Sequence, residues 1–160
     1  MAAVDIGDHA PDFSLPDQHG EPRDLRGLLA DGPLALFFYP AAMTPGCTAE
    51  SCRFRDLSAE FAELGAGCAG ISADPVDRQA AFDGRHGLGF PLLSDPDGTV
   101  ARSYGVRRTA PGLSALAPTR RHTFVIDTDR TVLQVVRSEI RMSAHADGAL
   151  EALRARRARG

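Results

Sequence analysis

The stretch PLALFFYPAAMTPGCTAESC, residues 33–52, carries the strongest structural signal in the chain. Its first part, residues 33–39, is a continuous apolar run closed by a proline, a pattern typical of a strand buried at the centre of a sheet. A helix is predicted over about 44–64, because threonine is a favoured N-cap residue and Pro45 suits the first helical position. Cys47 therefore falls in the first turn of a helix that directly follows a buried strand.

The sequence on either side of this stretch alternates between strand-like and helix-like segments. A hairpin is predicted within residues 5–26, where short alternating stretches are mixed with Pro, Asp and Gly. Strands are predicted at 67–72, 90–93, 123–126 and 132–137, and helices at 74–87, 98–104 and 143–157. Residues 106–119 read as a loop without a firm assignment. The pattern predicts an α/β fold, with a mixed sheet flanked by helices, in a single domain spanning residues 1–160.

Composition excludes several classes of function. The chain has 160 residues, 43% of them apolar, and its 18 basic and 21 acidic side chains give a net charge of -3. That balance does not favour a nucleic-acid partner. All the basic residues are Arg, so no Lys is available for Schiff-base or P-loop chemistry. No apolar stretch is long enough for a membrane span, and the N-terminus does not resemble a signal peptide, so we expect a cytoplasmic protein.

Three cysteines, Cys47, Cys52 and Cys68, carry the remaining signal. An odd number at low density does not indicate a secreted disulfide framework. At a helix start, free N–H groups and the positive end of the helix dipole favour a thiolate over a thiol. The hydroxyl of Thr44 can cap the same helix and can also bond to an oxygen held against Cys47. From placement alone, a reactive cysteine and a plain buried cysteine are equally well supported.

A longer pattern favours the reactive cysteine. Pro40-x-x-x-Thr44-x-x-Cys47 resembles the active-site signature of the peroxiredoxin family, and the string from Phe38 to Cys52 resembles its bacterioferritin-comigratory, or peroxiredoxin Q, branch. Further matching segments follow in the same order, among them APDF at 10–13, FPLLSDP at 90–96 and RHTFVID at 121–127. The resemblance implies a thioredoxin-like fold with the peroxiredoxin N-terminal hairpin. It also implies a thiol-dependent peroxidase that needs no cofactor or metal and reduces hydrogen peroxide and organic hydroperoxides.

The resemblance also implies roles for individual residues. Cys47 would be the peroxidatic nucleophile, and Pro40 would shield its sulfenic acid from water. Thr44, the amides around Gly46 and Cys47, and Arg121 would donate hydrogen bonds where charge develops on the peroxide. Neighbouring strand residues face opposite ways, so only one of Arg120 and Arg121 can reach the sulfur, and Arg121 matches the family position.

Glu50 and Phe38 are also expected to belong to the substrate site, although neither is expected to react with the peroxide. Glu50 is expected to orient an arginine rather than to act as a base, and Phe38 is expected to line the site. The motif departs from the branch at Ala41-Ala42-Met43, where charged residues are common, which affects the polarity of the pocket mouth.

Cys52 would be the resolving cysteine, by resemblance to the members of this branch with an intramolecular disulfide. Five residues along a regular helix separate two Cα atoms by roughly 8.6 Å, whereas a disulfide needs them within about 7 Å. We therefore predict that the helix start unwinds on oxidation and exposes a disulfide to a thioredoxin-like reductant. Cys68 is predicted to be an unreactive core residue with a raised pKa.

Other functions on the same fold would require different motifs; a disulfide oxidoreductase, for example, would show C-x-x-C, which this chain lacks. A copper carrier would show a C-x3-C pair with a partner histidine, and this chain has C-x4-C. The five histidines form no pair at ligand spacing. A redox-regulated holdase could coexist with peroxidase activity. The chain is expected to be a monomer or a weak homodimer.

Overall fold

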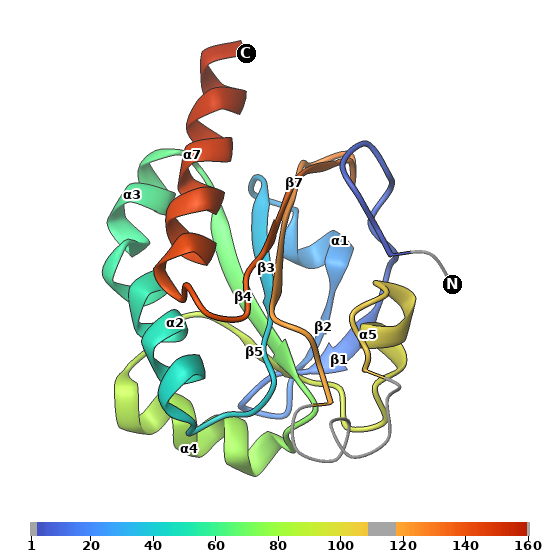
Figure 1. Cartoon of the computed structure of the whole chain (residues 1–160), viewed down its shortest axis with the longest axis vertical. Helices are drawn as coiled ribbons and strands as arrows, with labels where there is room; N and C mark the ends of the chain where they lie inside the picture. The colour runs from blue at the N-terminus through green and yellow to red at the C-terminus, as the bar shows by residue number, and fades with distance from the viewer. Residues whose placement is uncertain (1–2, 109–117, 160) are drawn as a thin grey trace.

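The computed structural model describes residues 3–108 and 118–159, and its core is one five-stranded sheet (Figure 1). The strands of this sheet lie in the order β5-β4-β3-β6-β7, and a separate β1-β2 pair forms a two-stranded sheet. The strands are β1 (Ser14–Pro16), β2 (Pro22–Asp24), β3 (Leu34–Phe38), β4 (Gly67–Ser72), β5 (Leu92–Ser94), β6 (His122–Ile126) and β7 (Val132–Arg137). The helices are α1 (Leu25–Leu28), α2 (Pro45–Asp56), α3 (Ser58–Glu63), α4 (Val76–His86), α5 (Thr99–Ser103) and α7 (Ser143–Arg159).

The central strand is β3, as its apolar run predicts. It pairs in parallel with β4 and antiparallel with β6, and every one of its five residues is buried. A strand with a neighbour on each side and a layer on each face exposes no side chain to water, which explains why it is apolar without alternation. The mixed α/β sheet and the N-terminal hairpin are confirmed.

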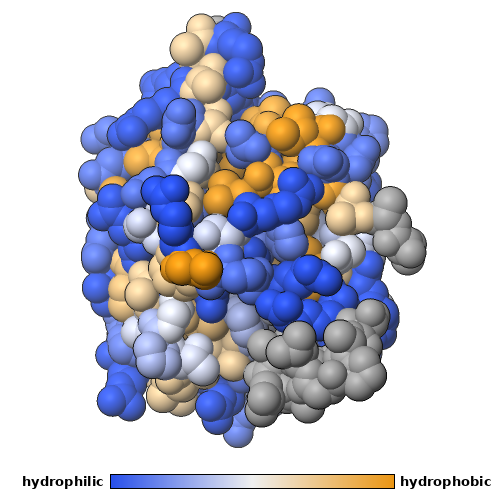
Figure 2. Space-filling view, in the orientation of Figure 1, coloured by the Kyte–Doolittle hydropathy of each residue, from blue (hydrophilic) through white to orange (hydrophobic). Residues whose placement is uncertain are grey.

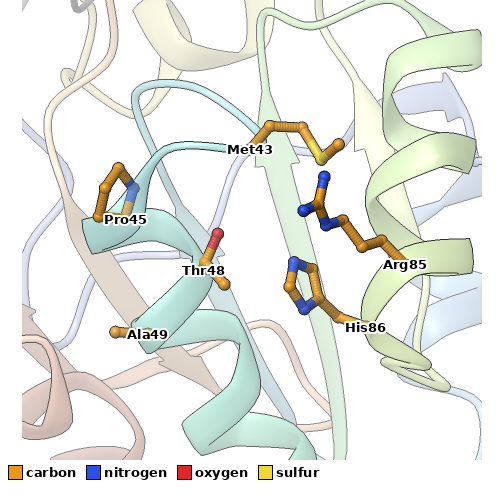
Figure 3. Close-up of a pocket in the computed structure, with 6 residues that line it drawn as sticks. All are labelled: Met43, Pro45, Thr48, Ala49, Arg85 and His86. Atoms are coloured by element: carbon orange, nitrogen blue, oxygen red, sulfur yellow. The ribbon is translucent and has the colours of Figure 1, made fainter.

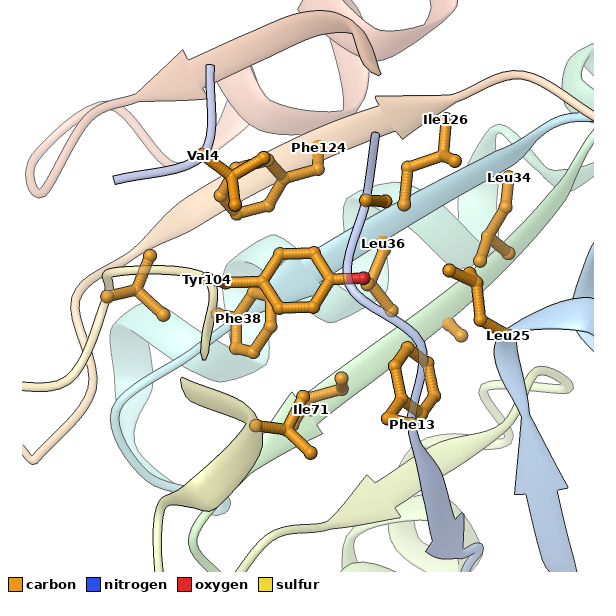
Figure 4. Close-up of a cluster of buried hydrophobic side chains, with 14 of the residues drawn as sticks. Val4, Phe13, Leu25, Leu34, Leu36, Phe38, Ile71, Tyr104, Phe124 and Ile126 are labelled. Carbon is orange, nitrogen blue, oxygen red and sulfur yellow. The ribbon is translucent and has the colours of Figure 1, made fainter. Parts of the chain in front are cut away.

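The two faces of the sheet carry separate hydrophobic cores. One core contains Cys47 and lies under α2, α3, α4 and α7, and the other lies under α1, α5 and the N-terminal segment (Figure 1). Because side chains alternate along a strand, Phe37 and Tyr39 join the Cys47 core, whereas Phe38 joins the opposite one. Phe38 packs there against Tyr104 and Phe124 (Figure 4), so the expectation that its side chain lines the substrate site is wrong.

The predicted helix at 44–64 is two helices. Leu57 leaves the helical conformation (φ −97°, ψ 10°), which ends α2 and starts α3 in a new direction. Phe54 and Phe61, seven residues apart and so on one face, both reach the core, where their rings stack with centroids 5.8 Å apart. Neither Gly nor Pro occurs at the break, so the sequence gives no local signal for it. The short helix α1 was also not predicted; it is capped by Asp24, which accepts a bond from the Gly27 amide at 2.7 Å.

Most of the loop predicted at 106–119 lies outside the described residues, which resume at 118. At its two ends, Arg107 and Thr119 form an isolated antiparallel bridge. In the part of the chain that the structure describes, no helix is long and apolar enough to cross a membrane.

Candidate active site

Cys47 lies in the first turn of α2 and is completely buried. The amide of Thr48 is the first to bond back along the chain, to the Thr44 carbonyl at 2.9 Å. The amides of Gly46 and Cys47 precede it, and first-turn amides have no acceptor within their own helix. Their N–H groups and the helix dipole therefore act together on whatever negative charge forms at the sulfur.

Thr44 occupies the N-cap position of α2, but it does not cap the helix with its side chain. Its hydroxyl donates instead to the carbonyl of Ala41 at 2.7 Å, which corrects the expected capping bond. This bond ties the loop between β3 and α2 to the helix start. The hydroxyl oxygen keeps its lone pairs, so in this geometry Thr44 presents an acceptor rather than a donor.

Arg121, just before β6, reaches the sulfur from the neighbouring strand. Its Nη1 lies 3.4 Å from Cys47 Sγ and donates to Glu50 Oε1 at 2.7 Å. Arg121 is buried, whereas Arg120 is exposed, the outcome expected from strand alternation. Gly46 makes this approach possible: a Cβ there would lie 3.2 Å from Arg121 Nη2.

Glu50 is completely buried one turn along α2 from Cys47. Burial raises the pKa of its carboxyl to about 8, against the attraction of Arg121. Oε1 accepts from Arg121, while Oε2 has no hydrogen-bond partner. Glu50 thus contacts the arginine directly.

Two residues at this site were not predicted from the sequence. His145, in the first turn of α7, is completely buried, and its Nδ1 lies 3.5 Å from Glu50 Oε2. Glu139, on the connection between β7 and α7, accepts a bond from the Arg121 amide at 2.8 Å. Both lie far along the chain from the Cys47 motif, so no spacing rule links them to it.

The other two cysteines differ in setting. Cys52 is partly buried on α2, which is continuous from Pro45 to Asp56, and all three cysteines are unbridged. Cys68, on β4, is also partly buried, and burial raises the pKa of its thiol to about 12. The raised pKa of Cys68 agrees with the sequence prediction.

The loop that carries the Ala41-Ala42-Met43 departure borders the site. Pro40 is half-buried at its start, and the Ala42 amide donates to Asp74 Oδ2 at 2.7 Å. Met43 adopts a left-handed φ of 69° and is exposed. With Arg85 opposite, it borders a surface pocket of about 420 Å³ between α2 and α4 (Figure 3). Among residues 3–108 and 118–159, no group of three or more His, Cys, Asp or Glu side chains could hold a metal ion.

A buried helix-start cysteine next to an arginine, on a thioredoxin-like sheet, is the arrangement of a thiol peroxidase. The model of the AhpC/TSA family matches residues 6–135. The chain is 60% identical to a putative peroxiredoxin of Mycobacterium tuberculosis, over 93% of this chain and 96% of the relative. It is 38% identical to the chloroplastic peroxiredoxin Q of Arabidopsis thaliana, over 97% of this chain and 69% of the relative.

Solved structures agree with the sequence comparison. The crystal structure of peroxidoxin BcpB from Mycobacterium tuberculosis superposes with a TM-score of 0.90 at 58% identity, covering 95% of this chain and 97% of that one. The chain therefore belongs to the AhpC/TSA family and is a peroxiredoxin, a peroxidase of the oxidoreductase class. Within the family it is similar to the peroxiredoxin Q, or bacterioferritin comigratory protein, branch. Membership implies a peroxide substrate and a thioredoxin-type reductant.

Proposed function

We propose that Cys47 is the peroxidatic cysteine and that Arg121 is its principal charged partner. The observation that carries this proposal is the 3.4 Å approach of Arg121 Nη1 to Cys47 Sγ at the N-terminus of α2. The thiolate attacks one peroxide oxygen, the O–O bond breaks, and Cys47 becomes a sulfenic acid. The leaving oxygen departs with the bonding electron pair and takes a proton to become water or an alcohol.

Negative charge spreads over the sulfur and both oxygens during this displacement, so fixed donors stabilise it most where they already point at the site. The amides of Gly46 and Cys47 approach from the helix start, and Arg121 approaches from the sheet. Thr44 supplies a hydrogen bond to the peroxide only if its hydroxyl turns away from the Ala41 carbonyl, its acceptor at 2.7 Å. Pro40 is proposed to limit water at the sulfur.

Cys52 is proposed to resolve the sulfenic acid. Its thiol condenses with the oxidised Cys47, forming an S–S bond and releasing water. Both cysteines lie on the continuous helix α2, where regular geometry keeps their Cα atoms roughly 8.6 Å apart. The bond therefore requires the start of α2 to unwind, which brings Cys47 out of the core. A thioredoxin-type protein then returns two electrons to the disulfide.

Peroxide consumption coupled to a thioredoxin system tests these roles. The Cys47→Ser variant is expected to lose turnover with any reductant. Cys52→Ser is expected to lose turnover with thioredoxin and to keep it with a small thiol, which can reduce the sulfenic acid directly. Turnover by Cys47→Ser would contradict the proposal for the nucleophile. Turnover by Cys52→Ser with thioredoxin as the reductant would contradict the resolving role and indicate a one-cysteine mechanism.

The remaining proposals concern setting and assembly. Hydrogen peroxide and small organic hydroperoxides are proposed as substrates, with neither nucleic acid nor membrane as a partner, in a single domain over residues 1–160. A cytoplasmic setting suits an enzyme that needs its cysteines reduced between turnovers.

A monomer or weak homodimer is proposed for the assembly. The face in Figure 2 is largely hydrophilic and is interrupted by apolar patches. The exposed large apolar side chains of the described residues are Ile6, Met43 and Ile140. Light scattering across a concentration series measures the assembly, and a stable oligomer at low concentration would contradict the proposal.

A further inference from the structure

A buried polar chain continues from the proposed nucleophile into α7. It runs from Cys47 through Arg121 and Glu50 to His145, whose ring also contacts Thr123. Glu50, Thr123 and His145 are each completely buried. Neither the proposed displacement nor the proposed disulfide step uses His145, so its presence here needs a separate explanation.

The two ring nitrogens of His145 have different partners. Nε2 lies 2.7 Å from the Ser138 carbonyl, which can only accept, so Nε2 carries a proton. Burial lowers the pKa of the imidazole, so Nδ1 is left as an acceptor. The Thr123 hydroxyl lies 2.8 Å from Nδ1, and Glu50 Oε2, which has no other hydrogen-bond partner, lies 3.5 Å from it, so these two groups compete for the single lone pair of Nδ1.

The charge on Glu50 determines how strongly the positive charge of Arg121 can stabilise the Cys47 thiolate. An ionised Glu50 would share the one guanidinium with a Cys47 thiolate, placing two buried anions against one cation. A protonated Glu50 still accepts from Arg121 through Oε1, and its Oε2 proton points to an acceptor. The acceptor that the structure provides near Oε2 is Nδ1 of His145.

We propose that His145 is a positioning residue of the peroxidase site: its Nδ1 accepts the Glu50 proton, keeping that carboxyl neutral and leaving the charge of Arg121 to the Cys47 thiolate. The inference rests on the proposed roles of Cys47 and Arg121. Deprotonation of Glu50 at high pH would then weaken the site, and the proton would leave to solvent.

Other charged groups surround this pair. The pKa of His145 is lowered by burial and further by Arg121, against a small opposing effect of Glu139 on the β7–α7 connection, which is itself paired with Arg108 at 2.7 Å. His122 on β6 has a pKa lowered to about 4 by burial, so it stays neutral over the working range. On the exposed side, Arg53 of α2 bonds Asp147 of α7 at 2.8 Å.

The pH profile of the second-order rate with hydrogen peroxide tests the proposal. In the wild type the rate is expected to fall roughly tenfold on the alkaline side, a factor equal to about 1.4 kcal/mol, as Glu50 ionises near pH 8. His145→Ala removes the acceptor and should move this fall about one pH unit lower. His145→Gln can still accept from Glu50 and donate to Ser138, so it should restore the wild-type position.

The Thr123→Val variant should shift the pH profile in the opposite direction. The hydroxyl that competes for Nδ1 is lost in a nearly isosteric change, so the alkaline fall should move to higher pH. A residue with a purely structural role would not produce shifts in opposite directions. His19→Gln, at an exposed histidine in the β1–β2 turn, serves as the matched control and should keep the wild-type profile.

An infrared difference spectrum, wild type minus Glu50→Gln, reports the carboxyl directly and needs no folded His145 variant. A protonated-carboxyl C=O band at pH 7 that shifts in His145→Gln or Thr123→Val supports the proposal. A missing band overturns it, as does a His145→Ala profile that matches the wild type. These results are separable from failure of the proposed function, which would appear as turnover by Cys47→Ser.

Discussion

The clearest quantitative prediction concerns the pH dependence of folding stability in Glu50→Gln. Burial raises the Glu50 pKa from 4.5 to about 8, because desolvation of the carboxylate outweighs the attraction of Arg121. A group whose pKa is higher when folded contributes its full stability below the unfolded pKa, and loses that stability as pH rises. The wild type should therefore lose stability between pH 4.5 and about 8 from this group.

The magnitude follows from the same difference. At about 1.36 kcal/mol per pKa unit, the range from 4.5 to about 8 corresponds to an upper bound of ~5 kcal/mol. Glutamine is neutral at every pH and keeps an oxygen that can accept from Arg121. Relative to the wild type, Glu50→Gln should thus gain ~1.4 kcal/mol per pH unit across this window.

Guanidinium unfolding at pH 5, 6.5 and 8 measures the difference in free energy of unfolding between the two proteins. The two are expected to be close at pH 5, with the variant more stable at pH 8. Glu151→Gln, at an exposed carboxylate on α7, controls for the loss of one charge and should show no comparable trend. If the wild type instead gains on Glu50→Gln as pH rises, Glu50 is ionised in the fold and the argument from burial is refuted.

Three further predictions concern the cysteines and the start of α2. Alkylation of Cys68 by iodoacetamide at pH 7 should be slow, because burial raises the Cys68 pKa to about 12 and leaves little thiolate to react. Peptide mass spectrometry measures the alkylation, and loss of turnover in Cys68→Ser would contradict the passive role of this cysteine. One equivalent of peroxide should increase amide hydrogen exchange at the start of α2 in the wild type but not in Cys52→Ser, and unchanged exchange alongside a Cys47–Cys52 link would refute the need for unwinding. Gly46→Ala should lower the rate with peroxide by roughly tenfold, about 1.4 kcal/mol, because its Cβ would lie 3.2 Å from Arg121 Nη2; Gly84→Ala, where a Cβ meets nothing within 4 Å, is the matched control.

The elements that could be predicted from the sequence are those specified by a few neighbouring residues. The apolar run of β3 identifies a central strand because only a strand covered on both faces lacks alternation. The threonine and proline before Cys47 mark a helix start for similarly local reasons, since N-cap and first-turn preferences act within a few residues. The peroxiredoxin resemblance rests on motifs of the same short range.

Other features depended on which face a side chain joins. Phe38 lies within the motif, but strand alternation sends it to the core opposite Cys47. The break at Leu57 has no Gly or Pro to signal it, and Phe54 and Phe61 would share one face of an uninterrupted helix as well. Local propensity therefore does not predict where α2 ends.

Local sequence patterns are enough to identify the central strand, the cysteine at the helix start and the family that these residues define. The groups around that cysteine follow only from the folded chain: the bond of Thr44 to Ala41, the burial of Glu50, and the approach of His145 from α7. Short-range preferences fix secondary structure, whereas burial and charge pairing arise only when distant segments pack together. The protonation state of Glu50 is therefore a property of the folded chain.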